Sequence, residues 1–269
     1  MISITDSTFI YMDWENLNSI DEVITLLGEI IADAETNQNT LGYFAALYQK
    51  VTMKVKSGIA EGFFEDGPRM EQLDIVFAQR YLAAYYAYQE TQPTTAAWQR
   101  AFDLSTDYWP IVLQHLVMGI NAHINLDLGI AAAEIAKGQD IEALAEDFKK
   151  INTILGDLVQ EVQDDLARIW PTLIWILKRT RKVDDFFIDF SMELARDGAW
   201  RFAKDLAAKP EQEWPALIAE RDEKVARQSR IVSHPGRIAS FVLRVARLGE
   251  RGSVSEKIGQ LKAPPSLLG

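Results

Sequence analysis

Apolar residues recur along most of this chain at intervals of three and four positions, which is the spacing of one face of an α-helix. Short turns that contain Gly, Pro or Asn separate these runs, and no alternating segments flank a hairpin dipeptide. The pattern predicts an all-α protein, a single multi-helical domain of roughly eight to ten helices. The expected helices cover about residues 20–35, 40–62, 68–90, 95–104, 110–137, 141–170, 183–208, 216–232 and 236–248.

The run at about residues 110–137 has apolar side chains all the way round, as expected for a central helix buried on every side. Pro110 stands at its expected first position, and Gly138 follows its end. A buried polar group without a partner costs about 1–3 kcal/mol, so we expect each polar side chain of this helix to be paired. Six such side chains occur in it: Gln114, His115, Asn121, His123, Asn125 and Asp127.

Charge divides the chain near Pro210. From Lys224 onward nine Lys and Arg stand against two Glu, whereas the chain as a whole carries a net charge of −11. We therefore expect residues 1–209 to form a helical core domain. Residues 210–269 are expected to form a basic C-terminal helical extension that packs on this acidic core.

The helix expected at about residues 236–248 is basic and amphipathic. We expect its apolar face to pack on the protein's own body or on a second subunit, so a homo-oligomer is one outcome. Binding of this basic helix to an anionic partner is the alternative. The residues that share the apolar face, spaced three and four apart, are Ile238, Phe241, Val242, Val245 and Leu248.

Composition argues against several classes of protein. The net charge of −11 argues against general affinity for nucleic acid, and the lack of cysteine excludes disulfides and thiolate chemistry. No uninterrupted apolar run approaches the length of about 18 residues that indicates a membrane span, and the N-terminus lacks the pattern of a signal peptide. These features favour a cytoplasmic protein that neither binds nucleic acid nor spans a membrane.

Gly119, His123 and Asp127 follow one another at intervals of four residues in the central helix. They form one column of that helix, with each residue about 40° from the last. Gly119 lacks a side chain, which leaves room beside His123 for a ligand, a water molecule or a close neighbour. Asp127 is placed to orient His123 as a base or to bind a metal together with it. The alternative is a buried pair that only satisfies its own polar groups.

Three further residues are candidates for the same site. His115 lies two turns before His123 and about 80° away, so it needs a residue of another helix to join that site. Asp74, on the preceding long helix, is placed to pair with either histidine. Arg80 lies among aromatic residues of that helix, which suggests a stacked or ion-paired guanidinium. The candidate pocket, for which packing in the core is the alternative, consists of Asp74, Arg80, His115, His123 and Asp127.

The sequence is compatible with at most a single metal ion. The spacing of His123 and Asp127 occurs in helical zinc-dependent hydrolases, but three histidines are too few for a three-zinc site. The remaining metal hypothesis is one divalent ion bound by these two residues and a further carboxylate, such as Asp184 or Asp185. We otherwise expect no cofactor.

The other polar residues of the central helix lie nearly opposite His123. Gln114, Asn121 and Asn125 are spaced seven and four apart, so they share a face. We expect their amides to form hydrogen bonds with neighbouring helices.

Four blocks of the sequence resemble a known family. They are LYQKVTMKV, MEQLDIVFAQRYLAAY, LVMGINAHINLDLGIA and RDGAW, and NAHINLDL is the most specific piece. In this order and spacing they resemble the bacterial domain-of-unknown-function family 5995 over about residues 40–205. The resemblance implies that the third helix and the central helix belong together, but it implies no activity, cofactor or catalytic residue.

Three functional interpretations remain open at this point. In the first, the buried polar cluster forms a pocket that binds a small molecule or catalyses a reaction. In the second, the cluster only specifies how the helices pack, and the protein has a structural or interaction role. The third is a hydrolase that depends on a single metal ion. The sequence does not decide whether the protein is an enzyme, and a cavity beside His123 would favour the first interpretation.

Overall fold

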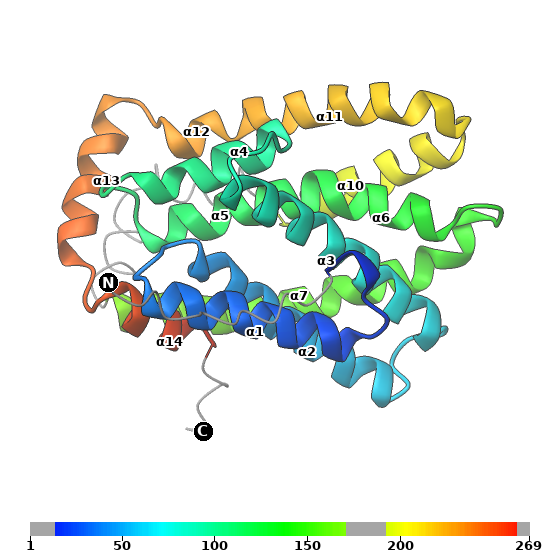
Figure 1. Ribbon diagram of the computed structural model, residues 1–269, viewed down its shortest axis with the longest axis horizontal. Helices are drawn as coiled ribbons and strands as arrows, with labels where there is room; N and C mark the ends of the chain where they lie inside the picture. Colours follow the sequence, from blue (N-terminus) through cyan, green and yellow to red (C-terminus); the bar gives the residue numbers. More distant parts are fainter. Residues whose placement is uncertain (1–13, 171–191, 263–269) are drawn as a thin grey trace, which may run out of the picture.

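The protein is a bundle of helices, described for residues 14–170 and 192–262 in a computed structural model (Figure 1). Every regular element in these two ranges is helical, which confirms the all-α prediction. The helices of the first range are α1 (Ile20–Thr36), α2 (Gly42–Ala60), α3 (Gly67–Gln89), α4 (Ala96–Asp103), α5 (Val112–Ala122), α6 (Leu128–Ile135) and α7 (Ala145–Ile169). Those of the second range are α10 (Met192–Ala207), α11 (Trp214–Gln228), α12 (Arg230–Ser233), α13 (Arg237–Gly249) and α14 (Val254–Lys262).

Some predicted features lie outside the described residues. Among them are the first part of the helix expected at about residues 183–208 and the two acidic residues considered as metal donors, Asp184 and Asp185. The described part of that helix is α10, which begins at Met192.

Side chains and backbone conformation account for where several helices begin and end. At the start of α1, the hydroxyl of Ser19 accepts a hydrogen bond from the N–H three residues later. The start of α4 is capped from another helix, because the carboxylate of Asp222 in α11 accepts from its first two N–H groups at 2.7 and 2.8 Å. Gly138, which follows α6, has φ of +72°, a conformation that favours glycine.

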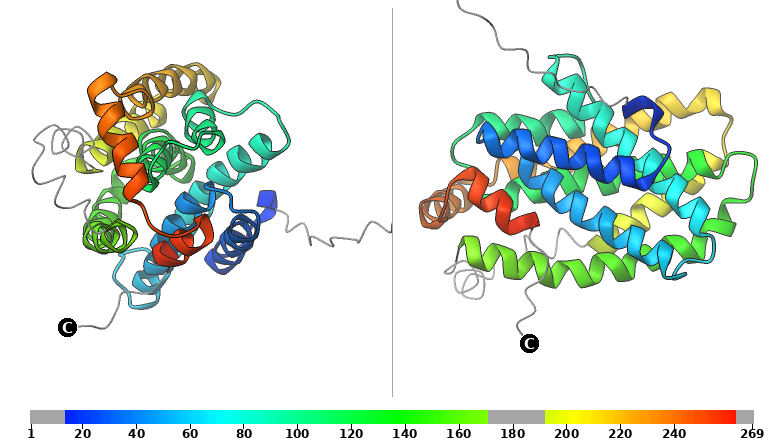
Figure 2. Two further views of the ribbon diagram at one scale, coloured as in Figure 1. Left: turned by 90° about the vertical axis from the view of Figure 1, so that its left-hand side faces the viewer. Right: turned by 60° about the horizontal axis from the view of Figure 1, so that its bottom comes forward.

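The central helix consists of α5, a π-helical turn labelled η3 (His123–Asp127) and α6. Helices α2, α3, α4, α10 and α11 pack around it (Figure 2). It begins at Val112 rather than at Pro110, because Ile111 is extended and its N–H donates to the side chain of Gln114 at 3.1 Å. The π-helical turn, which the regular apolar pattern did not predict, lies at the residues of the expected His–Asp column.

The central helix is long and apolar enough to cross a membrane, by length and composition alone. The span Val112–Ile135 has 24 residues and a mean hydropathy of 1.3, and 89% of its most apolar window is buried inside the protein. The core helix of a soluble protein has the same properties, so the expectation that the chain does not span a membrane stays a prediction.

The C-terminal helices contact the rest of the protein in several places. Helix α11 lies against α4, and α14 packs against α1, α2 and α7. Gly42 in α2 allows the close approach of α14, because an added Cβ would lie 2.6 Å from a side-chain atom of Ile258. That residues 1–209 and 210–269 are separate units stays a prediction.

Helix α13 stands across one end of the bundle (Figure 2, left). Three large side chains of its apolar face are exposed. The expectation that this face packs on the protein's own body is wrong for them, and packing on a second subunit stays a prediction. Ala246 is buried instead, and Gly249 comes so close to the body that an added Cβ would lie 2.4 Å from Trp170. Ala246 and Gly249 therefore face the bundle together with the half-buried Leu243, while the side chain of Ile238 lies outside the described residues. The exposed side chains are Phe241, Val245 and Leu248, at 68%, 49% and 71%.

Candidate functional site

Asp127 lies at the centre of the candidate site. Its carboxylate is 1% exposed and interacts with side chains from three elements. Oδ2 accepts a hydrogen bond from Nε1 of Trp98 in α4 at 2.7 Å and lies 3.3 Å from Nδ1 of His123. Oδ1 accepts from Nε of Arg80 in α3 at 3.1 Å. The predicted column and the predicted pairing of Arg80 therefore meet at one buried carboxylate.

His123 is oriented by this carboxylate. Burial lowers the pKa of His123 below its usual value, although its interactions with Asp127 act in the opposite direction, so the imidazole is neutral near pH 7. Because Asp127 serves as the acceptor, Nδ1 of His123 carries the proton and Nε2 keeps its lone pair. The arrangement is that of a histidine base held by a carboxylate.

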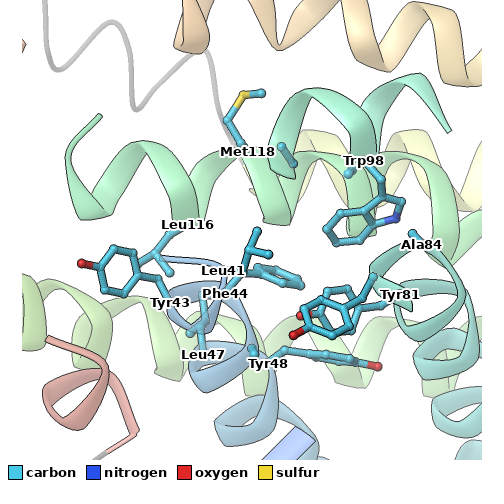
Figure 3. Close-up of a cluster of buried hydrophobic side chains, with 14 of the residues drawn as sticks. Leu41, Tyr43, Phe44, Leu47, Tyr48, Tyr81, Ala84, Trp98, Leu116 and Met118 are labelled. Atoms are coloured by element: carbon cyan, nitrogen blue, oxygen red, sulfur yellow. The ribbon is translucent and has the colours of Figure 1, made fainter. Parts of the chain in front are cut away.

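Aromatic rings surround His123. Its imidazole stacks on the ring of Phe77, with centroids 3.5 Å apart and planes inclined by 8°, and the ring of Tyr48 stands across it at 4.4 Å. Phe44 and Trp98 lie further out, with centroids at 5.7 and 5.9 Å. Figure 3 shows Phe44 and Tyr48 on α2, with Trp98 facing them from α4. The walls of the site are therefore apolar.

The space left by Gly119 contains a close neighbour. A Cβ added to Gly119 would lie 2.4 Å from a ring atom of Phe44, so glycine allows this ring to pack directly against the central helix. The sequence left three occupants open for this space. The structure places there the ring of Phe44 in α2.

Several polar groups of α2 and α3 lie near His123, and we call them, together with His123, the Tyr48 cluster: Tyr48, Thr52, Asp74, Tyr81 and His123. Burial raises the pKa of Tyr48 well above its usual value, and the charge of Asp74 raises it further. The hydroxyl of Thr52 lowers it by hydrogen bonding, and the ring of Tyr81 lies 5.7 Å from that of Tyr48. Tyr48 thus links the other members of the cluster.

Apart from the hydroxyls of Tyr48 and Thr52, which interact with each other, three buried atoms of the Tyr48 cluster have no hydrogen-bond partner among the described residues: Nε2 of His123, Oδ2 of Asp74 and the hydroxyl of Tyr81. Burial, and next the charge of Glu71, raise the pKa of Asp74 to about 8. The Asp74 carboxyl is therefore mostly protonated at neutral pH. The cluster combines a neutral acid, a neutral base and a phenol whose donor and acceptor capacity is unused.

His115 lies apart from this group. Its ring meets the edge of Tyr43 at 5.5 Å, and burial lowers its pKa to about 3, with the charges of Arg247 and Lys257 acting in the same direction. His115 also lines a partly open pocket of about 250 Å³, solvent at its mouth included. The other residues of this pocket are Thr40, Leu41, Phe44, Trp98, Ala101, Phe102 and Gly119.

The amides of the opposite face mostly have the expected role. Gln114 donates to the carbonyl of Val232 in α12 at 2.8 Å, and Asn121 donates to that of Val225 in α11 at 3.3 Å, which confirms the prediction for both. The prediction is wrong for the amide donor of Asn125, which binds Asn121 of the same helix at 3.0 Å. Asn121 and Asn125 are about one turn apart on the same side of the helix, so their side chains reach each other.

The donors around Asp127 are unfavourable for a cation. Both of its oxygens already interact with N–H groups, and the guanidinium of Arg80 is a competing positive charge. Within the described residues, no group of three or more His, Asp or Glu side chains is placed to hold a metal ion.

Sequence reasoning missed Trp98, Tyr48 and Phe77 as members of the site. The sequence favours core packing for their aromatic rings, and all three do pack in the core. One usable signal was that an indole N–H needs an acceptor when it is buried, and Asp127 was the nearest unexplained buried carboxylate on the central helix.

Comparison with known proteins identifies a family for this chain but no individual relative. A search of curated proteins and a search of solved structures found no match to this chain. The profile of one family, described as "Family of unknown function (DUF5995)", matches residues 20–235, so the match reaches beyond both ends of the resemblance noted in the sequence. This range includes α1, the Tyr48 cluster and α11, and the chain belongs to this family of unknown function, DUF5995.

Proposed function

We propose that this protein binds a small, uncharged polar molecule in the Tyr48 cluster, with His123 as its hydrogen-bond acceptor. The observation that carries the proposal is the set of unused atoms: Nε2 of His123, Oδ2 of Asp74 and the hydroxyl of Tyr81, all buried and without a partner among the described residues. A buried polar atom without a hydrogen bond costs about 1–3 kcal/mol. Three such atoms around one tyrosine support a ligand that would pair them, while the pocket described above, at His115 and Gly119, is lined by no member of the cluster.

The chemistry of the cluster limits the class of ligand. A neutral imidazole accepts a hydrogen bond and a protonated carboxyl donates one, so the ligand needs both a donor and an acceptor. The aromatic surroundings of the cluster, with Phe77 stacked on His123 and Phe44 packed on the central helix, favour a molecule with an apolar ring. An uncharged ring compound with hydroxyl or amide groups meets these requirements.

The same arrangement supports an enzymatic role. The Asp127 carboxylate orients His123, so that Nε2 is ready to take a proton from a bound O–H or N–H group. Asp74, with a pKa of about 8, is suited to give a proton near neutral pH. We propose general acid–base chemistry as the reaction class if the bound molecule is a substrate.

A purely structural role is the second candidate. It is favoured by the three donors on Asp127, which tie α3, α4 and the π-helical turn together without any ligand. This role explains Asp127 but leaves the unused atoms of the Tyr48 cluster unexplained. A single-metal hydrolase is the weakest of the three interpretations because Arg80 lies against the proposed metal ligand.

The test is a thermal-shift screen of uncharged ring compounds with hydroxyl or amide groups. The intact protein is compared with His123→Phe, which keeps an aromatic ring on Phe77 but removes Nε2. A ligand at about 100 times its Kd stabilises the folded state by about 2.7 kcal/mol, which is readily measured as a rise in Tm. We expect this rise in the wild type and its loss in His123→Phe.

The matched control is His115→Phe, the same substitution at the other buried histidine of the central helix. It should keep the ligand-induced rise in Tm. The structural alternative predicts instead that His123→Phe loses several kcal/mol of stability, as expected when a buried hydrogen-bonded pair is broken. That loss, together with a screen in which no compound distinguishes the wild type from His123→Phe, would refute the proposal.

A further inference from the structure

The exposed face of α13 presents large apolar side chains to solvent. Phe241, Val245 and Leu248 are 68%, 49% and 71% exposed, and their spacing of four and three residues places them on one side of the helix. Single exposed apolar residues are ordinary, whereas a row of three on an amphipathic helix indicates a binding surface.

Two exposed aromatic residues extend this face. Tyr108 and Trp109, in the segment before α5, are 66% and 43% exposed. They are joined to α13 by its arginines: Arg244 lies over the ring of Trp109 at 5.2 Å, and Arg247 lies over that of Tyr108 at 5.0 Å. Nε of Arg247 also donates to the backbone carbonyl of Tyr108 at 2.8 Å. Helix α13 and this aromatic pair therefore form one surface, which we call the α13 face: Tyr108, Trp109, Phe241, Arg244, Val245 and Leu248.

Positive charge surrounds the α13 face. Arg237, Arg244 and Arg251 are exposed on α13 or directly after it. Glu250, which follows α13, is 3% exposed and is paired with Arg247 and Lys257, so it does not offset this charge at the surface.

The rest of the protein is acidic. The net charge of the chain is −11 although its end from Lys224 is basic, and Asp107 is the exposed acid next to Tyr108. The α13 face is thus a basic, apolar end on an acidic molecule. A negatively charged surface attracts this end and repels the remainder, which gives the bound protein one orientation.

We propose that the α13 face docks the protein on an anionic lipid surface. An amphipathic helix with aromatic and leucine side chains on one face and arginines beside them lies in the interface of a membrane, with its apolar face below the headgroups. Trp and Tyr prefer the same depth, where one end of the ring is apolar and the other is hydrated. A second copy fits this surface less well, because a symmetric contact would bring the arginines of the two copies together.

The test is sedimentation of the intact protein with lipid vesicles. Vesicles made of phosphatidylglycerol and phosphatidylcholine in equal parts are compared with vesicles of phosphatidylcholine alone. We expect binding to the anionic vesicles to be at least about tenfold stronger, and to weaken as salt is added, because salt screens charges at an exposed surface. The result that overturns the proposal is equal binding to both kinds of vesicle, or binding to neither.

Paired variants separate the apolar and the charged contributions. Phe241→Ser combined with Leu248→Ser, and Arg244→Glu, should each weaken binding to anionic vesicles by about tenfold. The controls are Phe63→Ser, at a Phe that is 40% exposed after α2, and Lys209→Glu, in the turn between α10 and α11 at the other end of the molecule (Figure 1). Both controls should bind like the wild type.

Two results with these variants would count against lipid docking. Retained binding by both α13 variants would show that vesicles bind elsewhere. A dimer in solution that is lost in the double serine variant would show that a second copy covers the α13 face. Because every substituted side chain is exposed, we expect the variants to fold, and their circular dichroism spectra check this.

Discussion

The central helix meets a buried carboxylate at its first turn and another at its π-helical turn. At the first turn, Glu250 accepts a hydrogen bond from the N–H of Val112 at 2.7 Å. It also pairs with Arg247 and Lys257, each at 2.8 Å, and its side chain is 3% exposed. A negative charge at the start of a helix is favourable, and here both cations that balance it come from the same C-terminal segment. Glu250, Arg247 and Lys257 therefore all have charged partners.

At the π-helical turn, Asp127 has a similar set of partners but a different outcome. Trp98 and Arg80 donate to its oxygens, and His123 is its third partner. The histidine has a second nitrogen, and Nε2 faces no hydrogen-bond partner among the described residues.

Comparison of the clusters around Glu250 and Asp127 shows how to separate a structural cluster from a candidate site. In both, the carboxylate has partners for its charge. Beside Glu250 the groups without a hydrogen-bond partner among the described residues are the hydroxyl of Tyr43 and Nε1 of Trp170, whereas only the cluster at the π-helical turn leaves a histidine nitrogen and a carboxyl oxygen unused.

The largest loss of stability is expected for a substitution at Glu250, in the cluster at the first turn. Glu250→Gln should destabilise the protein by about 3–5 kcal/mol, because it leaves the buried ammonium of Lys257 without a counter-charge. Urea denaturation measures this loss. The matched control is Glu211→Gln, at an exposed pair with Lys137, where we expect a change below about 0.5 kcal/mol. A loss as small as the control's would mean that the first turn of the central helix does not depend on this charge.

Asp74→Asn should raise the stability of the protein, by an amount that depends on pH. The pKa of Asp74 is raised from 3.8 to about 8, so the folded protein holds a proton that the unfolded chain releases, and folding is penalised as pH rises through this interval. Asparagine has no such penalty. We expect the variant to be about as stable as the wild type near pH 4 and more stable by several kcal/mol near pH 9, since each pKa unit corresponds to about 1.4 kcal/mol.

The check on Asp74→Asn is urea denaturation at a series of pH values. Asp107→Asn, at an exposed residue, serves as the control and should show no comparable trend. A variant that is less stable than the wild type at high pH would mean that the Asp74 carboxylate has a stabilising partner, which would remove it from the group of unused atoms.

The smallest expected effect concerns Tyr81. Its ring is fully buried and its hydroxyl has no partner among the described residues, so Tyr81→Phe should stabilise the protein by about 1 kcal/mol. Tyr85→Phe is the matched comparison, because Gln89 forms a hydrogen bond with the hydroxyl of Tyr85, and it should destabilise slightly. If both substitutions destabilise equally in urea denaturation, the hydroxyl of Tyr81 has a hydrogen-bond partner and the contrast between the clusters around Glu250 and Asp127 weakens.

Much of the helical fold could be predicted from local sequence alone. The helix beginning after Ser19 was predicted from its apolar period and its start is capped as described above, and Gly138 ends the central helix in a left-handed conformation. These features depend on interactions between neighbours along the chain, so the apolar period and the cap residues are enough to predict them. The start of α4 could not be predicted in this way, because Asp222 caps it from more than a hundred residues away.

The candidate site was predictable in part. Asp127, His123 and Arg80 stood out because charged groups in an apolar helix or among aromatic residues need partners, and they do meet. His115 was placed with them on the basis of its type, yet it lies near Tyr43 instead. A residue type shows that a partner is needed, whereas the identity of the partner depends on how the helices cross.

The sequence by itself determined that the chain is helical, that one buried helix carries polar groups, and that its C-terminal end is basic. These properties follow from periodicity and composition, which packing does not change. Only the tertiary structure decided that Phe44 fills the space at Gly119, that Trp98 binds Asp127, and that α13 turns Ala246 inward. Each of these is a choice between faces of similar hydrophobicity, and such a choice is made by the shapes of distant segments that meet when the chain folds.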